Sequence, residues 1–130
     1  GNGGIIYPEL HYGRDSLVGV ALFLTHLANL DMTVAELRAS YPQYYMSKNK
    51  IELTPQIDVD AILVAMTDKY KNENISTIDG VKIDFASEWV HLRKSNTEPI
   101  IRIYTEAPTQ AEADTLAFRI IDEIKLIAGI

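Results

Sequence analysis

One ten-residue stretch of the sequence gathers side chains that could bind a phosphate group. Residues 93–102 read RKSNTEPIIR, so two arginines flank a polar run that contains Ser95, Asn96 and Thr97. Arginine donates paired hydrogen bonds to phosphate oxygens, and short hydroxyl and amide side chains can donate others. This combination favours a phosphate-monoester site. The residues alone also leave open an ordinary polar hairpin whose arginines are solvated.

A hairpin must bring the two arginines together for this chemistry to work. If residues 94–99 form the connection, Arg93 opposes Ile100 across two antiparallel strands. His91 then opposes Arg102, and the two arginines lie diagonal to each other on one face of the sheet. His91 would either support the phosphate group or serve as a structural histidine of the sheet.

The elements that must position this hairpin follow from the pattern of residues 44–130. Hydrophobic alternation and turn residues predict strands at about residues 44–53, 75–78, 81–85, 88–93 and 100–106. Asp58 is expected to cap a helix that reaches about residue 72, and the capping box from Thr109 to Glu112 opens a helix to about residue 127. Asp79-Gly80 is typical of a two-residue hairpin turn. The order β-α-β-β-β-α predicts an α+β fold, with an antiparallel four-stranded sheet and helices on one face.

The first part of the chain, residues 1–43, has a different pattern. Residues 3–7 could form a strand, and helices are expected at about residues 15–29 and 33–40. The first of these helices is apolar around nearly its whole circumference, so it should be buried on several sides. Little else in these residues could cover it. We therefore expect this segment to self-associate, to swap, or to pack back on residues 44–130.

Composition excludes several classes of protein. The 130 residues carry 12 Lys and Arg against 18 Asp and Glu, which argues against a nucleic-acid or membrane-surface partner. The absence of cysteine excludes disulfides and thiolate metal sites. No apolar run approaches the ~20 residues of a membrane span, and no signal peptide is evident, so a cytoplasmic location is expected. The first residues, GNGG without a methionine, indicate either a piece of a longer protein or an expression scar followed by native sequence.

Two segments resemble a known family. Residues 93–106, RKSNTEPIIRIYTE, resemble the phosphate-binding loop of the α-D-phosphohexomutases, which include phosphoglucomutase, phosphomannomutase and phosphoglucosamine mutase. Residues 1–6, GNGGII, resemble the end of that family's sugar-binding G-E-x-x-G loop, whose glutamate would precede Gly1. Asn2 is therefore a weak candidate for a sugar contact. The resemblance implies that residues 1–43 end the family's third, α/β domain and that residues 44–130 form its fourth, TATA-box-binding-protein-like domain.

The resemblance also implies a function. In that family a phosphoserine and a Mg²⁺ ion, both in other domains, shift a phosphoryl group between hexose 1-phosphate and hexose 6-phosphate through a hexose bisphosphate. The fourth domain holds the phosphate that is not reacting. This implies the phosphate ligands Arg93, Ser95, Asn96, Thr97 and Arg102.

The chain departs from the complete family pattern in ways that limit its own chemistry. It lacks the phosphoserine motif and the D-x-D-x-D-R metal motif, so no catalytic residue and no metal ligand is expected in it. Asp58-Val59-Asp60 is better explained as a helix start. The isolated chain should therefore be inactive, with a phosphosugar and the remaining domains of the longer protein as its partners. The alternatives are a free-standing small-molecule binding or regulatory domain and a structural interaction module.

Overall fold

The computed structural model describes residues 4–54, 57–95 and 97–130. Contacts within the chain divide it into two compact units, Gly1–Pro42 and Gln43–Ile130.

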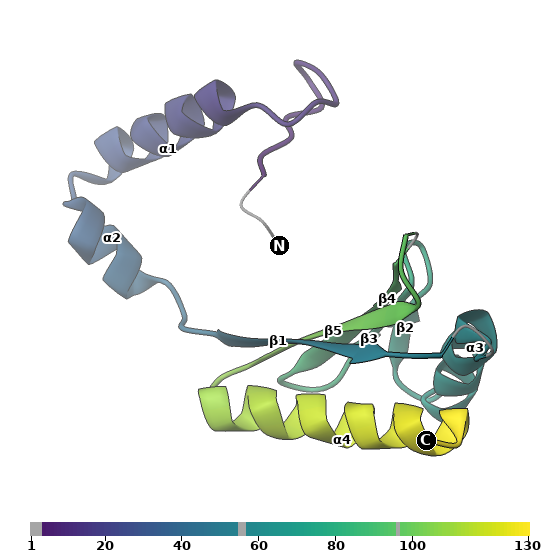
Figure 1. The fold of residues 1–130 in the computed structure, drawn as a ribbon. Helices are drawn as coiled ribbons and strands as arrows, with labels where there is room; N and C mark the ends of the chain where they lie inside the picture. The colour runs from purple at the N-terminus through teal and green to yellow at the C-terminus, as the bar shows by residue number, and fades with distance from the viewer. Residues whose placement is uncertain (1–3, 55–56, 96) are drawn as a thin grey trace. The chain divides into compact units, whose positions relative to one another are not determined.

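The second unit is built on one antiparallel sheet (Figure 1). Its strands run in the spatial order β1-β5-β4-β3-β2. Their bounds are Tyr45–Glu52 for β1, Asn74–Ser76 for β2, Val81–Asp84 for β3, Trp89–Lys94 for β4 and Ile100–Ala107 for β5. The predicted α+β class is confirmed. The sheet has five strands where the expected fold has four. The additional strand is β2, which overlaps the strand predicted at residues 75–78 and pairs with β3 at the edge.

Two helices cover one face of this sheet. Helix α3 spans Val59–Lys69 and begins at Asp58, whose carboxylate accepts from the first-turn amides as predicted. Helix α4 spans Gln110–Ala128 and opens with the predicted capping box. The core lies between these helices and the sheet. Its fully buried side chains include Met66, Ile83, Val90, Leu92, Ile101, Ile103, Leu116, Ile120 and Ile124.

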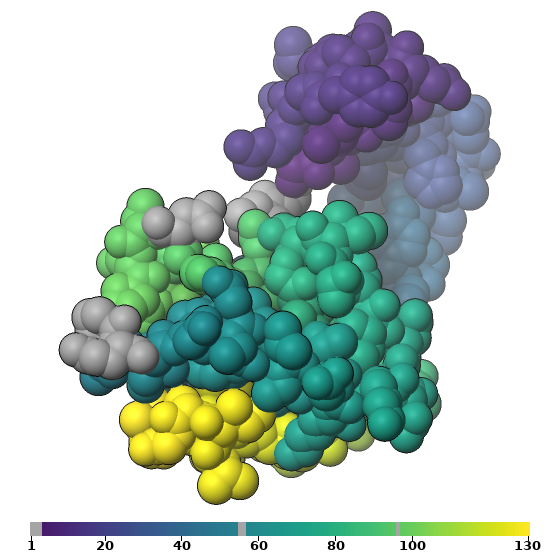
Figure 2. All heavy atoms as spheres, turned by 90° about the vertical axis from the view of Figure 1, so that its right-hand side faces the viewer, coloured from purple at the N-terminus to yellow at the C-terminus, as the bar shows by residue number. Residues whose placement is uncertain are grey.

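The opposite face of the sheet carries no helix among the described parts of this unit (Figure 1). The antiparallel register places alternate residues of β1, β3, β4 and β5 on it, and these are mostly charged or aromatic. In Figure 2 the hairpin of β4 and β5 (green) and α4 (yellow) lie on opposite sides of the unit. The candidate phosphate-binding residues therefore lie away from the helical layer.

The predicted two-residue turn at Asp79-Gly80 is wrong. Ser76 pairs with Lys82, which leaves residues 77–81 between the paired positions. A type I′ turn needs positive φ at both central residues. Here Gly80 has φ 75° but Asp79 does not have a positive φ. Asp79 turns towards β4 instead of closing a tight hairpin.

The first unit consists of two helices and the segment before them. Helix α1 spans Ser16–Leu30 and is capped by Asp15. Helix α2 spans Val34–Ser40 and opens with a capping box formed by Thr33 and Glu36. The strand expected at residues 3–7 does not form in the described part, where Tyr7 makes only an isolated bridge to His11. This unit offers no partner strand among its described residues, and Pro8 has no N–H to donate.

Helix α1 has no buried residue, although its sequence is strongly apolar. No single helix within the described ranges is long and apolar enough to span a membrane. Helices α1 and α2 meet that criterion only when taken together as a pair bent by 90°.

Candidate functional site

The two arginines of the candidate site lie directly opposite each other. Arg93 on β4 pairs with Arg102 on β5, and Lys94 pairs with Ile101. The expected register, with Arg93 opposite Ile100, is therefore wrong by two residues. The two arginines still share one face of the sheet, as predicted, and side chains that oppose each other directly have Cβ atoms only ~4.5–5.5 Å apart.

The register follows from the hydrogen bonds around Pro99. Proline cannot donate to a strand ladder, and the amide of Ile100 donates within the loop to the Glu98 carbonyl at 2.8 Å. The last hydrogen bond between the two strands therefore uses the carbonyl of Ile100, which accepts from the Ser95 amide at 3.1 Å. The Pro99 carbonyl accepts from the Leu53 amide at 2.8 Å, which ties the loop to the end of β1.

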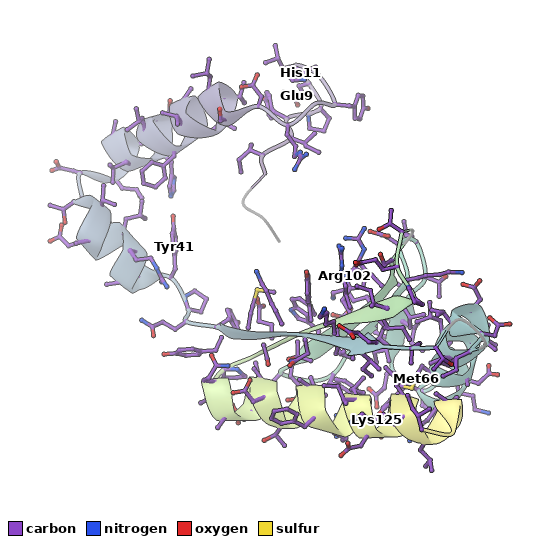
Figure 3. The ribbon with its side chains drawn as sticks, viewed as in Figure 1. Glu9, His11, Tyr41, Met66, Arg102 and Lys125 are labelled. Carbon is purple, nitrogen blue, oxygen red and sulfur yellow. The ribbon has the colours of Figure 1, made fainter. Side chains whose placement is uncertain are left out.

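A third cation extends this pair across the sheet. Lys50 on β1 lies opposite Arg102, so Lys50, Arg102 and Arg93 form one row over three adjacent strands. We call these three residues the cation row. Figure 3 shows Arg102 on the side of the sheet opposite Met66, in agreement with its exposed side chain. Like charges that oppose each other directly in a sheet are destabilising.

The outer members of the cation row have acidic partners. Lys50 Nζ lies 2.8 Å from Glu52 Oε1, and Arg93 Nη2 lies 2.9 Å from Asp79 Oδ2. The hydrogen bond and the charge of Glu52 raise the pKa of Lys50, with a smaller contribution from Glu98. Within the described part of the chain, Arg102 has no carboxylate at ion-pair distance. The middle of the row is therefore a concentration of uncompensated positive charge.

The polar loop beside the cation row keeps part of its hydrogen-bonding capacity for a ligand. Ser95 is half-buried and Thr97 is exposed. Their hydroxyl oxygens are 3.5 Å apart, and the Thr97 amide lies 3.4 Å from Ser95 Oγ. These are long contacts, which a stronger acceptor could replace. Asn96 and Asn2, the other two predicted ligands, lie outside the described residues.

His91 lies on the same strand as Arg93 but not where the sequence analysis placed it. The prediction that His91 lies opposite Arg102 is wrong, because the register differs by two residues. His91 lies opposite Tyr104 instead. Its Nε2 donates a hydrogen bond to the main-chain carbonyl of Asp79. This contact ties β4 to the turn before β3.

Two residues near the arginines were missed by the sequence analysis. Lys50 and Asp79 reach the site only because segments that are distant in sequence lie beside β4 and β5. Hydrophobic alternation along residues 44–53 could have placed Lys50 on the polar face, but its position opposite Arg102 depends on register. No local signal in the sequence indicates that Asp79 contacts Arg93.

The remaining cation of the stretch points to the other side. Lys94 alternates with Arg93 along β4, and its Nζ lies 2.6 Å from Asp60 Oδ2 of α3. It stabilises the contact between sheet and helix and is not part of the site. Among the residues that the structure describes, no three acidic or histidine side chains converge as metal ligands. No described residue is therefore assigned to a metal.

Comparison with known proteins connects this site to a family. Residues 48–123, which include most of β1, the cation row and most of α4, match the model of the phosphoglucomutase/phosphomannomutase C-terminal domain. The chain belongs to the phosphoglucomutase/phosphomannomutase family. This confirms the resemblance seen in the loop sequence.

Individual relatives agree with this assignment. A phosphoglucosamine/phosphogalactosamine mutase from Sulfurisphaera tokodaii is 41% identical over 128 residues, covering 97% of this chain and 27% of the relative. A phosphoglucomutase/phosphomannomutase from Thermococcus kodakarensis is 37% identical over 112 residues, covering 86% of this chain and 25% of the relative. The chain thus spans about a quarter of the length of these phosphohexomutases.

A solved structure supports the fold. A crystal structure of a phosphoglucomutase/phosphomannomutase family protein from Burkholderia thailandensis superposes with a TM-score of 0.64 at 22% sequence identity. The match covers 95% of this chain and 26% of that one. At this identity the comparison shows the architecture of the family and not the chemistry of its site.

Proposed function

We propose that the unit Gln43–Ile130 binds the phosphate group of a hexose phosphate at Arg93, Arg102 and the loop of Ser95, Asn96 and Thr97. The observation that carries this proposal is the position of Arg102 between two other cations, without a carboxylate partner in the described part of the chain. Asn96 enters the proposal from the sequence alone.

The energetics of the cation row favour an anionic ligand. Directly opposed like charges in a sheet are destabilising. A phosphate dianion between the guanidinium groups would replace this repulsion with attraction, and each charge-assisted hydrogen bond contributes ~1.5–3 kcal/mol in a well-formed site. The site is open to solvent on the uncovered face of the sheet, so we expect an affinity of about 1 mM for the isolated chain.

The longer protein is proposed to be a mutase that interconverts hexose 1-phosphate and hexose 6-phosphate. The names of its relatives support this reaction, and they include mutases acting on glucosamine, galactosamine, glucose and mannose phosphates. In this proposal the phosphoserine and the Mg²⁺ ion lie outside the present residues, and a hexose bisphosphate is the intermediate. Binding energy at the distant phosphate would orient the reacting end of the sugar.

Titration of the ¹⁵N-labelled chain with glucose 6-phosphate tests phosphate binding. The amides of Ser95, Asn96 and Thr97 should shift first, and Arg93→Ala should weaken binding about tenfold or more, because at least one charge-assisted bond is lost. Arg119→Ala is a matched control, since Arg119 lies on α4 and contacts Glu88 at 3.6 Å. Saturation without movement of the loop amides, or equal affinities in both variants, would contradict the proposal and favour solvated arginines.

A further inference from the structure

Asp79, in the turn between β2 and β3, contacts the phosphate-site strand through both its side chain and its main chain. The Asp79 carboxylate lies 2.9 Å from Arg93 Nη2. The main-chain carbonyl of Asp79 accepts a hydrogen bond from His91 Nε2. His91 and Arg93 are alternate residues of β4 and share its uncovered face, so Asp79 contacts two successive side chains of this face.

The neighbouring Gly80 makes this close approach possible. Its φ of 75° lies in the left-handed region that favours glycine. A Cβ at this position would collide with the main-chain oxygen of Leu92 and would also lie 3.3 Å from the Cα of Arg93. The turn therefore rests against the backbone of β4 between the two side chains that Asp79 contacts. Asp79 is held there by the local backbone as well as by its ion pair.

The ion pair occupies only part of the Arg93 guanidinium group. That group carries five N–H donors in a planar arrangement, and Asp79 contacts it at Nη2. No other side-chain partner of this group is found within residues 4–54, 57–95 and 97–130, so the other terminal nitrogen and Nε remain for a ligand. A long side chain that is already restrained loses less conformational entropy when it binds.

We propose that Asp79 is a positioning residue of the phosphate site, which holds one edge of Arg93 so that the other edge faces the phosphate group. This inference rests on the proposed function of Arg93. It attributes to Asp79 two effects of opposite sign. Its oxygen atoms orient the arginine, which favours binding, whereas its negative charge repels the phosphate dianion.

Two substitutions separate these effects. Asp79→Ala removes both the oxygen atoms of the side chain and its charge, and Asp79→Asn keeps one oxygen atom near Arg93 Nη2 while it removes the charge. We expect the alanine variant to bind glucose 6-phosphate about two- to tenfold more weakly, the cost of ordering one long side chain. The asparagine variant should bind at least as tightly as the unsubstituted chain.

Asp84→Ala is the matched control for surface charge. Asp84 is another aspartate on the same face of the sheet, but it pairs with Lys82 and lies opposite Trp89, two residue pairs away from Arg93 on that face. Its loss changes the net charge by the same amount without touching Arg93. We expect the Asp84→Ala variant to bind glucose 6-phosphate as tightly as the unsubstituted chain does. Unfolding temperatures should be measured for every variant, so that loss of folding is not mistaken for loss of positioning.

A second measurement needs no ligand. The Arg93 Nε–H resonance should report an ordered side chain, with a high heteronuclear NOE, in the unsubstituted chain and in Asp79→Asn. It should report a mobile side chain in Asp79→Ala and in Gly80→Ala, where the added Cβ pushes the turn away from β4. If Gly80→Ala is unstable, the comparison of Asp79→Ala with Asp79→Asn still tests the inference, because asparagine has the same side-chain shape as aspartate.

The outcomes distinguish this inference from the proposed function. If the chain binds phosphate through Arg93 but Asp79→Ala binds as tightly as the unsubstituted chain or more tightly, the positioning role is wrong and the proposed function stands. Equal mobility of Arg93 in all variants would also overturn the positioning role. If the unsubstituted chain does not bind phosphate, both are wrong.

Discussion

Arg102 illustrates, for a single residue, how the proposed binding site would oppose stability. Its two neighbours in the cation row, Lys50 and Arg93, are both positively charged and both paired to carboxylates. A site that concentrates charge in this way is unfavourable until an anion binds, because the repulsion between directly opposed side chains is present in the free protein.

We predict that Arg102→Gln stabilises the free chain while it weakens phosphate binding. The free energy of unfolding should rise, because the like-charge contacts of Arg102 with Lys50 and Arg93 are relieved. We expect a gain about as large as the ~0.2–1 kcal/mol that an opposite-charge pair contributes in a sheet. Affinity for glucose 6-phosphate should fall about tenfold or more, since a charge-assisted bond contributes at least ~1.5 kcal/mol. Urea denaturation and NMR titration of the same samples measure the two effects.

Lys48→Gln serves as the control for this prediction. Lys48 lies on the same face, with its Nζ 5.7 Å from the centre of the Tyr104 ring, and is not a member of the cation row. Its loss should leave phosphate affinity nearly unchanged. A destabilised Arg102→Gln variant with unaltered affinity would show that Arg102 has a structural role instead.

At the scale of elements, Tyr70 connects the two helices that support the sheet. It ends α3, and its hydroxyl donates to Glu123 of α4, with oxygen distances of 2.9 and 3.1 Å. Its ring packs edge-on against Phe85 at 5.5 Å between centroids. Burial raises the pKa of Tyr70 to about 12, and the hydrogen bond to Glu123 contributes in the same direction.

This raised pKa predicts a loss of stability in alkaline solution. Because the folded state favours the neutral phenol, the stabilisation is complete below the ordinary pKa of 10.0 and is lost as the pH rises from there to about 12. Tyr70→Phe lacks this titration, so the free energy of unfolding should fall less steeply over that interval than in the unsubstituted chain. Parallel pH profiles would contradict the prediction.

At the scale of the whole molecule, the two units differ in how they bury apolar surface. All the buried residues of the core cluster belong to the second unit and fall within residues 51–124 of the sequence. In the first unit, helix α1 has no buried residue, and its exposed side chains include Leu17, Val20, Leu22, Phe23 and Leu24. Burial of one large apolar side chain contributes ~1.5–3 kcal/mol, and monomers seldom leave a large apolar patch exposed.

We therefore predict that the 130-residue chain self-associates through residues 1–43, whereas a shorter chain starting at Gln43 is a folded monomer. Light scattering gives the mass of each species, and thermal melts followed by circular dichroism show whether each unfolds cooperatively. An unfolded shorter chain would contradict the prediction. A monomeric full chain with α1 ordered and exposed would contradict it as well.

The division of labour proposed for the longer protein predicts that this chain alone does not turn over substrate. Phosphoryl transfer depends on positioning and on neutralisation of charge at the reacting group, and the sequence has neither the phosphoserine motif nor the metal motif of the family. A coupled assay with glucose 1-phosphate, Mg²⁺ and glucose 1,6-bisphosphate should show no product above background. The full-length protein is the positive control, and turnover by the purified chain would refute the assignment.

Local signals in the sequence were sufficient for most elements and for the centre of the site. The caps at Asp15, Thr33, Asp58 and Thr109 depend on a few neighbouring residues, so the helix starts were predicted correctly. The two arginines and the loop between them are likewise close in sequence. The register of their strands was wrong by two residues, but side chains alternate with a period of two, so the predicted face was still correct.

Tertiary structure alone decided which residues surround that centre. Lys50 lies in the cation row because β1 pairs with β5. Asp79 contacts Arg93 because the turn before β3 packs against the backbone of β4. Both contacts join segments that are distant in sequence. Asp79 contacts Arg93 where its local sequence had predicted a tight two-residue turn. The sequence by itself determined which side chains could bind phosphate. The pairing of distant strands decided which charges lie beside them, because register depends on the packing of the whole sheet and not on any one segment.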